Sequence, residues 1–308
     1  MKSIPRIGLG TWKSPNNEQV TESVRYAIEE AGYRHIDCAT LYQNEANVGK
    51  AINDVLTRGV VKREELWVTS KLWSTDHRSE DVEKACRKSL KDLQVDYIDL
   101  YLIHWPISLK KEGDELFPKD RNGNLDVDES VSIHETWKAM EKLVEKKLVR
   151  YIGVSNFTIE MIEKLLHFDD LKVRPFAVQI ECHLYLQQLA LIEYCTKRKI
   201  IVEGYACLGS GDFAPPEAPC LLKDEVLNEI AKNIGKSPAQ VELQFLYQLD
   251  PNLIILVKSV HPKRIKENIQ RGFKLNDEQM EKLKKRDRCY RYYDSKLAWG
   301  IIVFGDHW

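Results

Sequence analysis

The sequence lacks a large net charge, a long apolar run and a signal-peptide pattern. Its 46 basic and 47 acidic residues leave a formal charge of −1, so no whole-chain field attracts nucleic acid or an anionic membrane. No stretch approaches the ~20 apolar residues of a membrane span. The first residues, MKSIPRIGLG, lack the apolar segment of a secretory signal. We therefore expect a cytoplasmic protein with no nucleic-acid or membrane partner.

Closely spaced cysteines are also absent. The seven cysteines are scattered along the chain and include no Cys-X-X-Cys pair. An odd, dispersed set favours reduced thiols over a disulfide framework. We expect each cysteine to act as a small core residue, and we expect no metal site.

The chain contains no interdomain linker and no glycine-rich dinucleotide fingerprint. Gly8 and Gly10 do not form Gly-X-Gly-X-X-Gly, which argues against an open, doubly wound sheet. Apolar strand-like runs alternate instead with amphipathic segments. The strand-like runs are residues 6–12, 34–39, 65–72, 97–105, 149–156, 176–182, 200–206 and 253–259. The amphipathic segments are residues 18–32, 79–94, 132–147, 158–168, 187–199 and 223–235.

This alternation predicts the fold class. In residues 18–32, for example, Val20, Val24 and Ile28 share one helix face, and Gly32 is expected to end the helix. Apolar strands that alternate with helices indicate a parallel sheet with right-handed crossovers. Eight such units in 308 residues predict an α/β protein with one domain, a closed (β/α)8 TIM barrel spanning residues 1–308.

Polar residues follow several of the predicted strands. Asp37, Lys71 and His104 end the second, third and fourth strands, and Tyr42 lies five residues beyond Asp37. The carboxyl ends of barrel strands meet at one rim, so an acid, an ammonium, an imidazole and a phenol can converge there. Each has a structural alternative: an Asp–Lys pair, a core histidine and a packing tyrosine. Their convergence favours catalysis.

Three segments carry a family resemblance: residues 32–49, 141–157 and 258–270. With the motifs VTSKLW, LIHWP, VSNF and QIECH in order between them, nearly the whole chain resembles the aldo-keto reductase superfamily, closest to the aldose and aldehyde reductases. The resemblance implies a (β/α)8 barrel, NADPH as cofactor and reduction of a carbonyl to an alcohol. It implies Tyr42 as proton donor, helped by Lys71 and Asp37, with His104 orienting the carbonyl. A tyrosine has an ordinary pKa near ~10, and a nearby ammonium stabilises its anion.

The resemblance also implies a cofactor site. Tyr205 would stack on the nicotinamide, and Lys258 and Arg264 would hold the adenosine 2′-phosphate. By the same resemblance, Ser155, Asn156 and Gln179 would bind the carboxamide, Ser259 the phosphate, and Glu267 and Asn268 the adenine. The remaining implied cofactor residues are Thr11, Trp12, Leu208, Ser210 and Val260. The alternative for the basic residues at 258–266 is a solvated helix start.

Aromatic residues at the expected barrel mouth imply the substrate pocket: Trp12, Trp73, Trp105 and Phe117. Loops 106–130 and 210–222 and the tail from about residue 289 would frame it. The tail resembles no family pattern, Phe213 stands near an expected pocket tryptophan, and the family's N-terminal hairpin looks shortened. The physiological substrate is therefore left open.

Two readings compete with a reductase. One is a non-catalytic structural or redox-sensing barrel that binds NADPH. The other is a nucleic-acid or partner site in the basic, aromatic segment 282–293, against which a solvated helix end is the simpler interpretation. We expect a monomer.

Overall fold

The computed structural model describes residues 4–15, 17–209 and 217–304, and it shows a closed barrel of parallel strands. Each strand pairs with the next in the chain, and β1 pairs with β8 to close the ring. The strands are β1 Ile7–Gly10, β2 His35–Asp37, β3 Trp67–Leu72, β4 Ile98–Ile103, β5 Val149–Ser155, β6 Ala177–Glu181, β7 Ile201–Tyr205 and β8 Ile254–Val257. The predicted single-domain TIM-barrel architecture is confirmed, and each strand lies within its predicted run.

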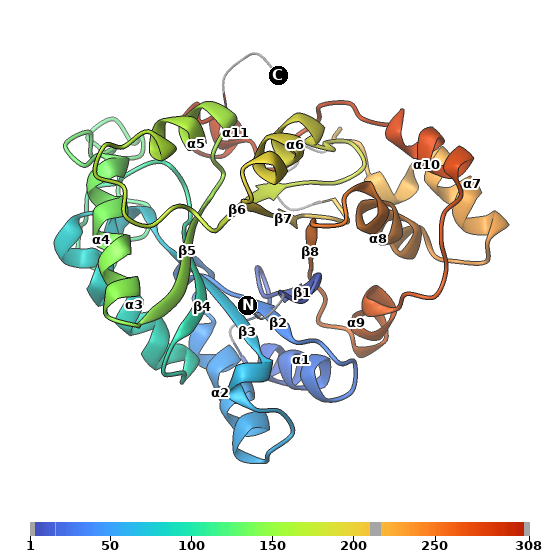
Figure 1. Cartoon of the computed structure of the whole chain (residues 1–308), viewed down its shortest axis with the longest axis horizontal. Helices are drawn as coiled ribbons and strands as arrows, with labels where there is room; N and C mark the ends of the chain where they lie inside the picture. The colour runs from blue at the N-terminus through green and yellow to red at the C-terminus, as the bar shows by residue number, and fades with distance from the viewer. Residues whose placement is uncertain (1–3, 16, 210–216, 305–308) are drawn as a thin grey trace.

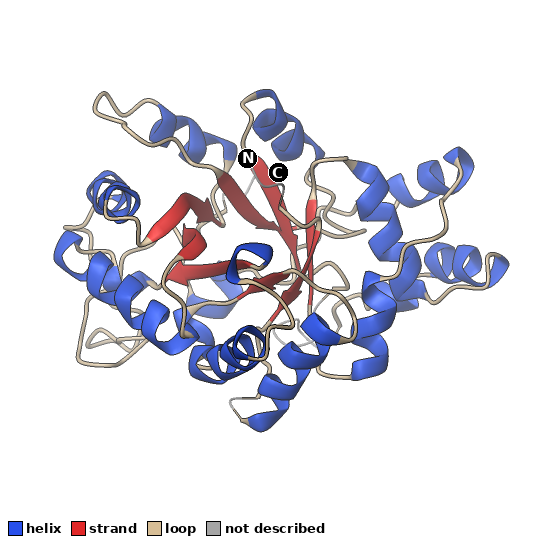
Figure 2. Cartoon of the chain, turned by 60° about the horizontal axis from the view of Figure 1, so that its bottom comes forward, coloured by secondary structure: helices blue, strands red, loops and turns tan. Residues whose placement is uncertain are grey.

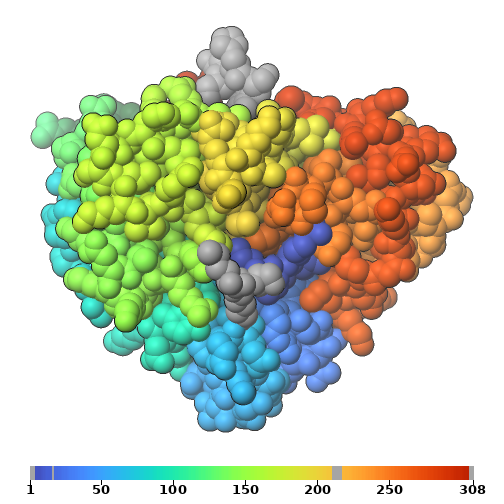
Figure 3. Space-filling view, in the orientation of Figure 1, coloured from blue at the N-terminus to red at the C-terminus, as the bar shows by residue number. Residues whose placement is uncertain are grey.

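Helices surround the strands on the outside (Figures 1 and 2). They are α1 Glu18–Glu29, α2 Glu45–Thr57, α3 Ser79–Leu93, α4 Ile133–Glu145, α5 Ile159–Leu166, α6 Leu189–Lys197, α7 Glu225–Asn233, α8 Pro238–Leu249, α9 Pro262–Ile269, α10 Asp277–Lys284 and α11 Ser295–Trp299. Consecutive segments follow one another around the molecule in the space-filling view (Figure 3). No described helix has both the length and the apolar character needed to cross a bilayer.

Two helices that sequence periodicity missed have clear physical explanations. Helix α8 buries residues on nearly every side, including Val241, Glu242 and Leu243 in succession, so no polar face marks its period. Helix α2 contains Gly49, which a sequence pattern treats as a breaker. A Cβ at Gly49 would lie 2.1 Å from the carbonyl oxygen of Asp92, so the glycine is required for close packing of α2 on α3.

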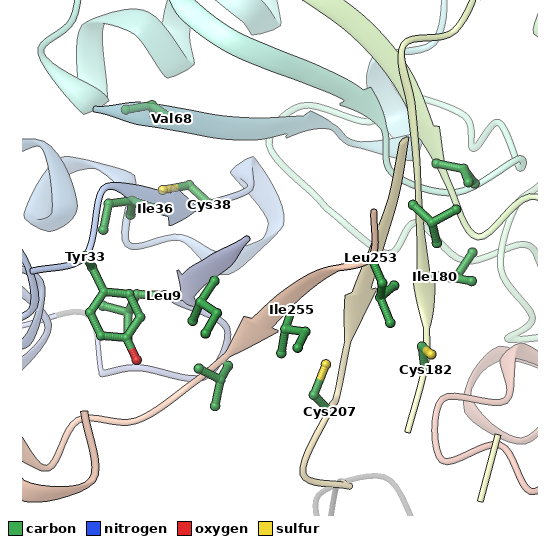
Figure 4. Packing of buried hydrophobic residues seen from close by; sticks show 14 of the residues in the cluster. Leu9, Tyr33, Ile36, Cys38, Val68, Ile180, Cys182, Cys207, Leu253 and Ile255 are labelled. Atoms are coloured by element: carbon green, nitrogen blue, oxygen red, sulfur yellow. The ribbon is translucent and has the colours of Figure 1, made fainter. Parts of the chain in front are cut away.

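The alternation of side chains along each strand separates the two sides of the barrel wall. On β3, Val68 belongs to the apolar layer under the helices, whereas Trp67 belongs to a separate cluster with Leu100 and Leu102. Figure 4 shows part of the outer layer, in which Leu9, Ile36 and Ile255 come from neighbouring strands. Lys71 is four residues beyond Trp67 on the same strand, so the alternation places its side chain on the same, inner side of the wall.

An aromatic stack fills the barrel around Trp67. The Trp67 ring stacks on Tyr151 at 5.7 Å between ring centroids and on Phe176 at 6.1 Å. Trp67 begins β3, Phe176 directly precedes β6 and Tyr151 is the third residue of β5, so the stack lies toward the end of the barrel opposite the strand C-termini. Polar side chains occupy the other end, where parallel barrels place their active sites.

Candidate active site

Lys71 is the centre of the polar cluster at the strand C-termini. Its side chain is fully buried, and its ammonium donates to Asp37 Oδ1 at 2.7 Å, to the Cys38 carbonyl oxygen at 2.8 Å and to Tyr42 Oη at 3.2 Å. An ammonium has three N–H donors, and these three acceptors use them all. Asp37 and Lys71 come from β2 and β3, and Tyr42 ends a short 3₁₀ turn, Thr40–Tyr42, that follows β2. The structure thus brings three of the four predicted catalytic residues into one hydrogen-bonded chain.

The Asp37 carboxylate anchors this series of hydrogen bonds. One oxygen accepts from Lys71, and the other accepts from Gln179 Nε2 at 2.8 Å. The Thr11 hydroxyl donates to the Asp37 main-chain oxygen at 2.9 Å. A buried ammonium without a paired anion would carry a large desolvation cost, and the ion pair with Asp37 offsets that cost.

Burial dominates the electrostatics of Tyr42. From the sequence we expected the nearby Lys71 ammonium to stabilise the Tyr42 anion. Burial, followed by the negative charge of Asp37, raises the pKa of Tyr42 well above its ordinary value. The phenol therefore stays protonated across the neutral range, which a proton donor requires. Help from Lys71 comes through its hydrogen bond, which strengthens as charge develops on the phenolic oxygen.

His104, immediately after β4, completes the cluster. Its ring lies edge-on to Tyr42, with 5.8 Å between centroids, and edge-on to Trp73 at 5.4 Å. Burial, and then the neighbouring Lys71 charge, lower the pKa of His104 well below its ordinary value. The imidazole is therefore neutral at pH 7, and it can donate one N–H without adding a second positive charge.

A cavity of about 310 Å³ opens over Tyr42 and His104. Its wall includes both of these residues and Asp37, together with much of the predicted cofactor set. The cofactor residues in the wall are Trp12, Ser155, Asn156, Gln179, Tyr205, Leu208 and Lys258.

Asn156 connects the cofactor side of the cavity to the catalytic side. It adopts a left-handed conformation, with φ of 64°, directly after β5. Its amide nitrogen donates to the His104 carbonyl oxygen at 2.9 Å, and its amide oxygen accepts from Tyr205 Oη at 2.6 Å. The orientations of His104 and Tyr205 are thus linked through one side chain.

The other predicted cofactor residues that the structure describes do not line this cavity. Thr11 is buried behind Asp37, and Ser210 lies outside the described residues, as does Phe213. Ser259, Val260, Arg264, Glu267 and Asn268 lie at or just before α9. Arg264 is exposed in the first turn of α9, whereas Glu267 is 3.9 Å from the Lys263 ammonium. The predicted phosphate site is therefore a separate region that begins beyond Lys258.

Trp105 and Phe117 form part of the cavity wall, but Trp73 does not. Trp73 is buried behind them, its ring 5.3 Å from Phe117 between centroids, and its Nε1 donates to the Leu116 carbonyl oxygen at 2.7 Å. It supports His104 and Phe117 from the rear. Trp12 lies across the cavity, 4.9 Å from the Tyr42 ring.

The C-terminal tail supplies wall residues that sequence reasoning did not assign. Trp299, at the end of α11, packs edge-on against Trp105 at 4.6 Å between centroids, and Tyr293 and Ser295 also line the cavity. Glu181 at the end of β6 anchors the tail by accepting from the main-chain N–H groups of Tyr292 at 2.6 Å and Tyr293 at 3.0 Å. The abundance of aromatic residues after position 289 was the available signal.

Most of the basic residues of segment 282–293 form ion pairs within the fold. Lys282 and Lys284 pair with Glu278 and Glu281 on α10. Arg286 and Arg288 both approach Asp224, at 2.7 and 3.6 Å, and Arg291 lies 3.8 Å from Glu181. The arginines are thus anchors of the tail and the two lysines form pairs within α10, which weakens the argument for a nucleic-acid site there.

Comparisons with a family model, with related sequences and with a solved structure all identify aldo-keto reductases as the similar proteins. A model of the Aldo/keto reductase family matches residues 6–288. The chain is 45% identical over 295 residues to "Aldo-keto reductase family 1 member A1" of Gallus gallus, which covers 94% of this chain and 88% of that protein. It is 44% identical over 301 residues to "Aldo-keto reductase family 1 member C18" of Rattus norvegicus, with 96% and 92% covered. The structure of the aldose reductase from Schistosoma japonicum superposes with a TM-score of 0.89 at 42% identity, covering 100% of this chain and 97% of that chain.

Proposed function

The chain belongs to the aldo/keto reductase family of oxidoreductases, and on that premise we propose that it reduces aldehydes, and some ketones, to alcohols with NADPH. The observation that carries the proposal is the Lys71 ammonium, which bridges Asp37 and Tyr42 beside the cavity. We propose a single barrel domain over residues 1–308, with the tail from about residue 289 as a substrate loop. It would act as a monomer in the cytoplasm.

The residues around the cavity suit a nicotinamide. The Gln179 amide nitrogen already donates to the carboxyl groups of Asp37 and Glu203, so its amide oxygen is the atom left to accept from a ligand. Ser155 and Asn156 offer polar groups beside it, and Tyr205 offers a ring face in the same wall. Lys258 and Arg264 would hold a 2′-phosphate beyond the cavity. When bound, NADPH supplies the hydride that this chemistry needs.

The protein's own part is to place the carbonyl and to deliver a proton. Neutral His104 donates a hydrogen bond to the carbonyl oxygen and orients it. As hydride adds to the carbonyl carbon, Tyr42 transfers its hydroxyl proton to the oxygen, so that the C=O π bond is replaced by C–H and O–H bonds. Lys71 stabilises the resulting phenolate, which recovers a proton from water. Asp37 holds the Lys71 ammonium in place throughout.

The test is consumption of NADPH in the presence of an aromatic aldehyde, followed by absorbance, with the alcohol product identified by chromatography. We expect turnover, with one molecule of alcohol formed for each NADPH oxidised. Tight NADPH binding without turnover across a panel of sugars, aromatic aldehydes, ketosteroids and lipid aldehydes would instead support the non-catalytic barrel.

The cavity wall predicts the preferred substrates. Trp12, Trp105, Phe117 and Trp299 offer ring area, and apolar area removed from water contributes about 25 cal/mol per Å². A sugar would bury hydroxyls at about 1–3 kcal/mol for each one left unpaired. We therefore expect aromatic and medium-chain aldehydes to have higher kcat/KM than open-chain glucose or xylose.

Trp105→Ala tests this substrate preference directly. Losing an aromatic wall worth about 1–2 kcal/mol should lower kcat/KM for nitrobenzaldehyde roughly tenfold, and it should affect a short aliphatic aldehyde much less. Steady-state kinetics with both substrates on wild type and variant provide the measurement. A wild-type enzyme that ranks a free aldose above nitrobenzaldehyde would contradict the argument and direct attention to Tyr293, Asp294 and Ser295, the polar tail residues in the wall.

A further inference from the structure

Glu203 is a buried carboxyl inside the barrel that the mechanism above does not use. It lies in β7, paired in register with Gln179 of β6, and its side chain is fully buried. Its Oε1 is 3.9 Å from His35 Nε2 of β2, a strand that does not neighbour β7 in the sheet. The side chain therefore reaches across the barrel interior rather than outward to the helices.

One amide group links Glu203 to the catalytic chain. Gln179 Nε2 donates to Glu203 Oε2 at 2.9 Å and to Asp37 Oδ2 at 2.8 Å. Both N–H groups of the Gln179 amide are thus fixed by carboxyl oxygens, and the amide oxygen is directed away from them. A continuous path runs from Glu203 through Gln179 and Asp37 to Lys71 and Tyr42.

We propose that Glu203 is a positioning residue for the reduction, which acts through Gln179 on the cofactor carboxamide and on the Asp37–Lys71 pair. The inference rests on the proposed function. In its positioning role, Glu203 holds the Gln179 amide so that its oxygen can accept from the carboxamide N–H. In its electrostatic role, the ionisation state of Glu203 determines whether Lys71 faces one carboxylate, that of Asp37, or two.

The surroundings of Glu203 determine when it carries charge. Burial, and next the charge of Asp37, raise the pKa of Glu203 to about 8, against opposing contributions from Gln179 and Lys71. Its neighbour His35 is neutral because burial lowers the pKa of His35 to about 4. Thr69, from β3, contributes only a hydroxyl that is 3.1 Å from His35 Nε2. At pH 7 the carboxyl is therefore mostly protonated, and among the residues that the structure describes the charges that act on it are those of Asp37 and Lys71.

Ionisation of Glu203 opposes proton transfer from Tyr42. A second carboxylate near Lys71 makes the surroundings more negative, and a phenolate forms less readily beside negative charge. The rate of reduction should therefore fall as pH rises through about 8. The pKa of Tyr42 itself is raised well above its ordinary value, so its own titration does not occur in that interval.

The experiment compares two isosteric substitutions, Glu203→Gln and Glu242→Gln. Glu242 on α8 is a matched control, because it is also fully buried and burial also raises the pKa of Glu242 to about 8. It accepts from the Leu184 main-chain N–H and does not line the cavity. For the wild type and for Glu242→Gln we expect kcat to fall roughly three- to tenfold between about pH 7 and pH 9.5. For Glu203→Gln we expect the fall to be absent, so that kcat of this variant at about pH 9.5 stays close to its own value at pH 7.

A third variant, Glu203→Ala, tests the positioning role. It removes the second acceptor of Gln179, so we expect NADPH to bind several-fold more weakly, whereas Glu203→Gln keeps an acceptor and should bind within about twofold of wild type. Binding is measured by quenching of tryptophan fluorescence, because Trp12, Trp105 and Trp299 line the cavity.

These outcomes separate the inference from the proposed function. No turnover by the wild type contradicts the function, and the Glu203 assignment is then judged by NADPH binding to Glu203→Ala against wild type. The assignment itself is overturned if Glu203→Gln keeps the alkaline fall, if Glu242→Gln removes it, or if Glu203→Ala binds NADPH as tightly as wild type.

Discussion

Tyr42→Phe is expected to lower kcat for aldehyde reduction by about 10²–10⁴-fold, the usual contribution of a positioned general acid. The substitution removes only the hydroxyl that accepts from Lys71 at 3.2 Å. The ring keeps its packing against Trp12 and His104, so the cavity wall and the NADPH affinity should change little. The measurements are the steady-state rate with nitrobenzaldehyde and a fluorescence titration with NADPH.

A matched control is Tyr101→Phe. Tyr101 is fully buried on β4 but lies outside the cavity wall, so the same atom is removed away from the catalytic chain. We expect this variant to keep the wild-type rate. Reductase activity of Tyr42→Phe within a few-fold of wild type would exclude Tyr42 as the proton donor, and His104 would then be the group to test.

The fold was accessible from the sequence because barrel strands are short apolar runs with regular spacing. The run 65–72 shows what such a pattern can determine: it contains β3, and its alternation places Lys71 on the inner side. The pattern failed where burial removes polarity from a helix, as in α8, or where packing requires a glycine, as at Gly49 of α2. Neither feature has a local signature that distinguishes it from a strand or a loop.

The sequence allowed only part of the site to be predicted. Asp37, Lys71 and His104 stood out because polar residues at the ends of apolar strands need partners. Trp299 did not, because its contact with Trp105 spans nearly two hundred positions of the chain. The direction of the Tyr42 pKa shift was also inaccessible, because it depends on how completely the surrounding chain excludes water from the phenol. Glu203 was missed because its role depends on a side chain from another strand, Gln179.

Cofactor choice provides the second large expected effect. We predict that the enzyme prefers NADPH to NADH, and that Lys258→Met combined with Arg264→Met abolishes the preference by weakening NADPH alone. Hydrogen bonds to charged groups contribute about 1.5–3 kcal/mol each, so removing both cations should raise KM for NADPH by about 10²-fold or more and leave KM for NADH nearly unchanged. The measurement is KM for each cofactor at a fixed, saturating aldehyde concentration.

The position of these cations supports an effect on the phosphate rather than on the nicotinamide. Lys258 directly follows β8 and lines the edge of the cavity, and Arg264 is exposed in the first turn of α9, where main-chain N–H groups also favour an anion. Lys263→Met is the control, because Lys263 carries the same charge in the same helix turn but faces Glu267 at 3.9 Å. We expect that variant to keep the preference. Because the interaction is between charges near the surface, the wild-type preference should also shrink as salt is added. Equal use of NADPH and NADH by the wild type would show that Lys258 and Arg264 form a solvated helix start and not a phosphate site.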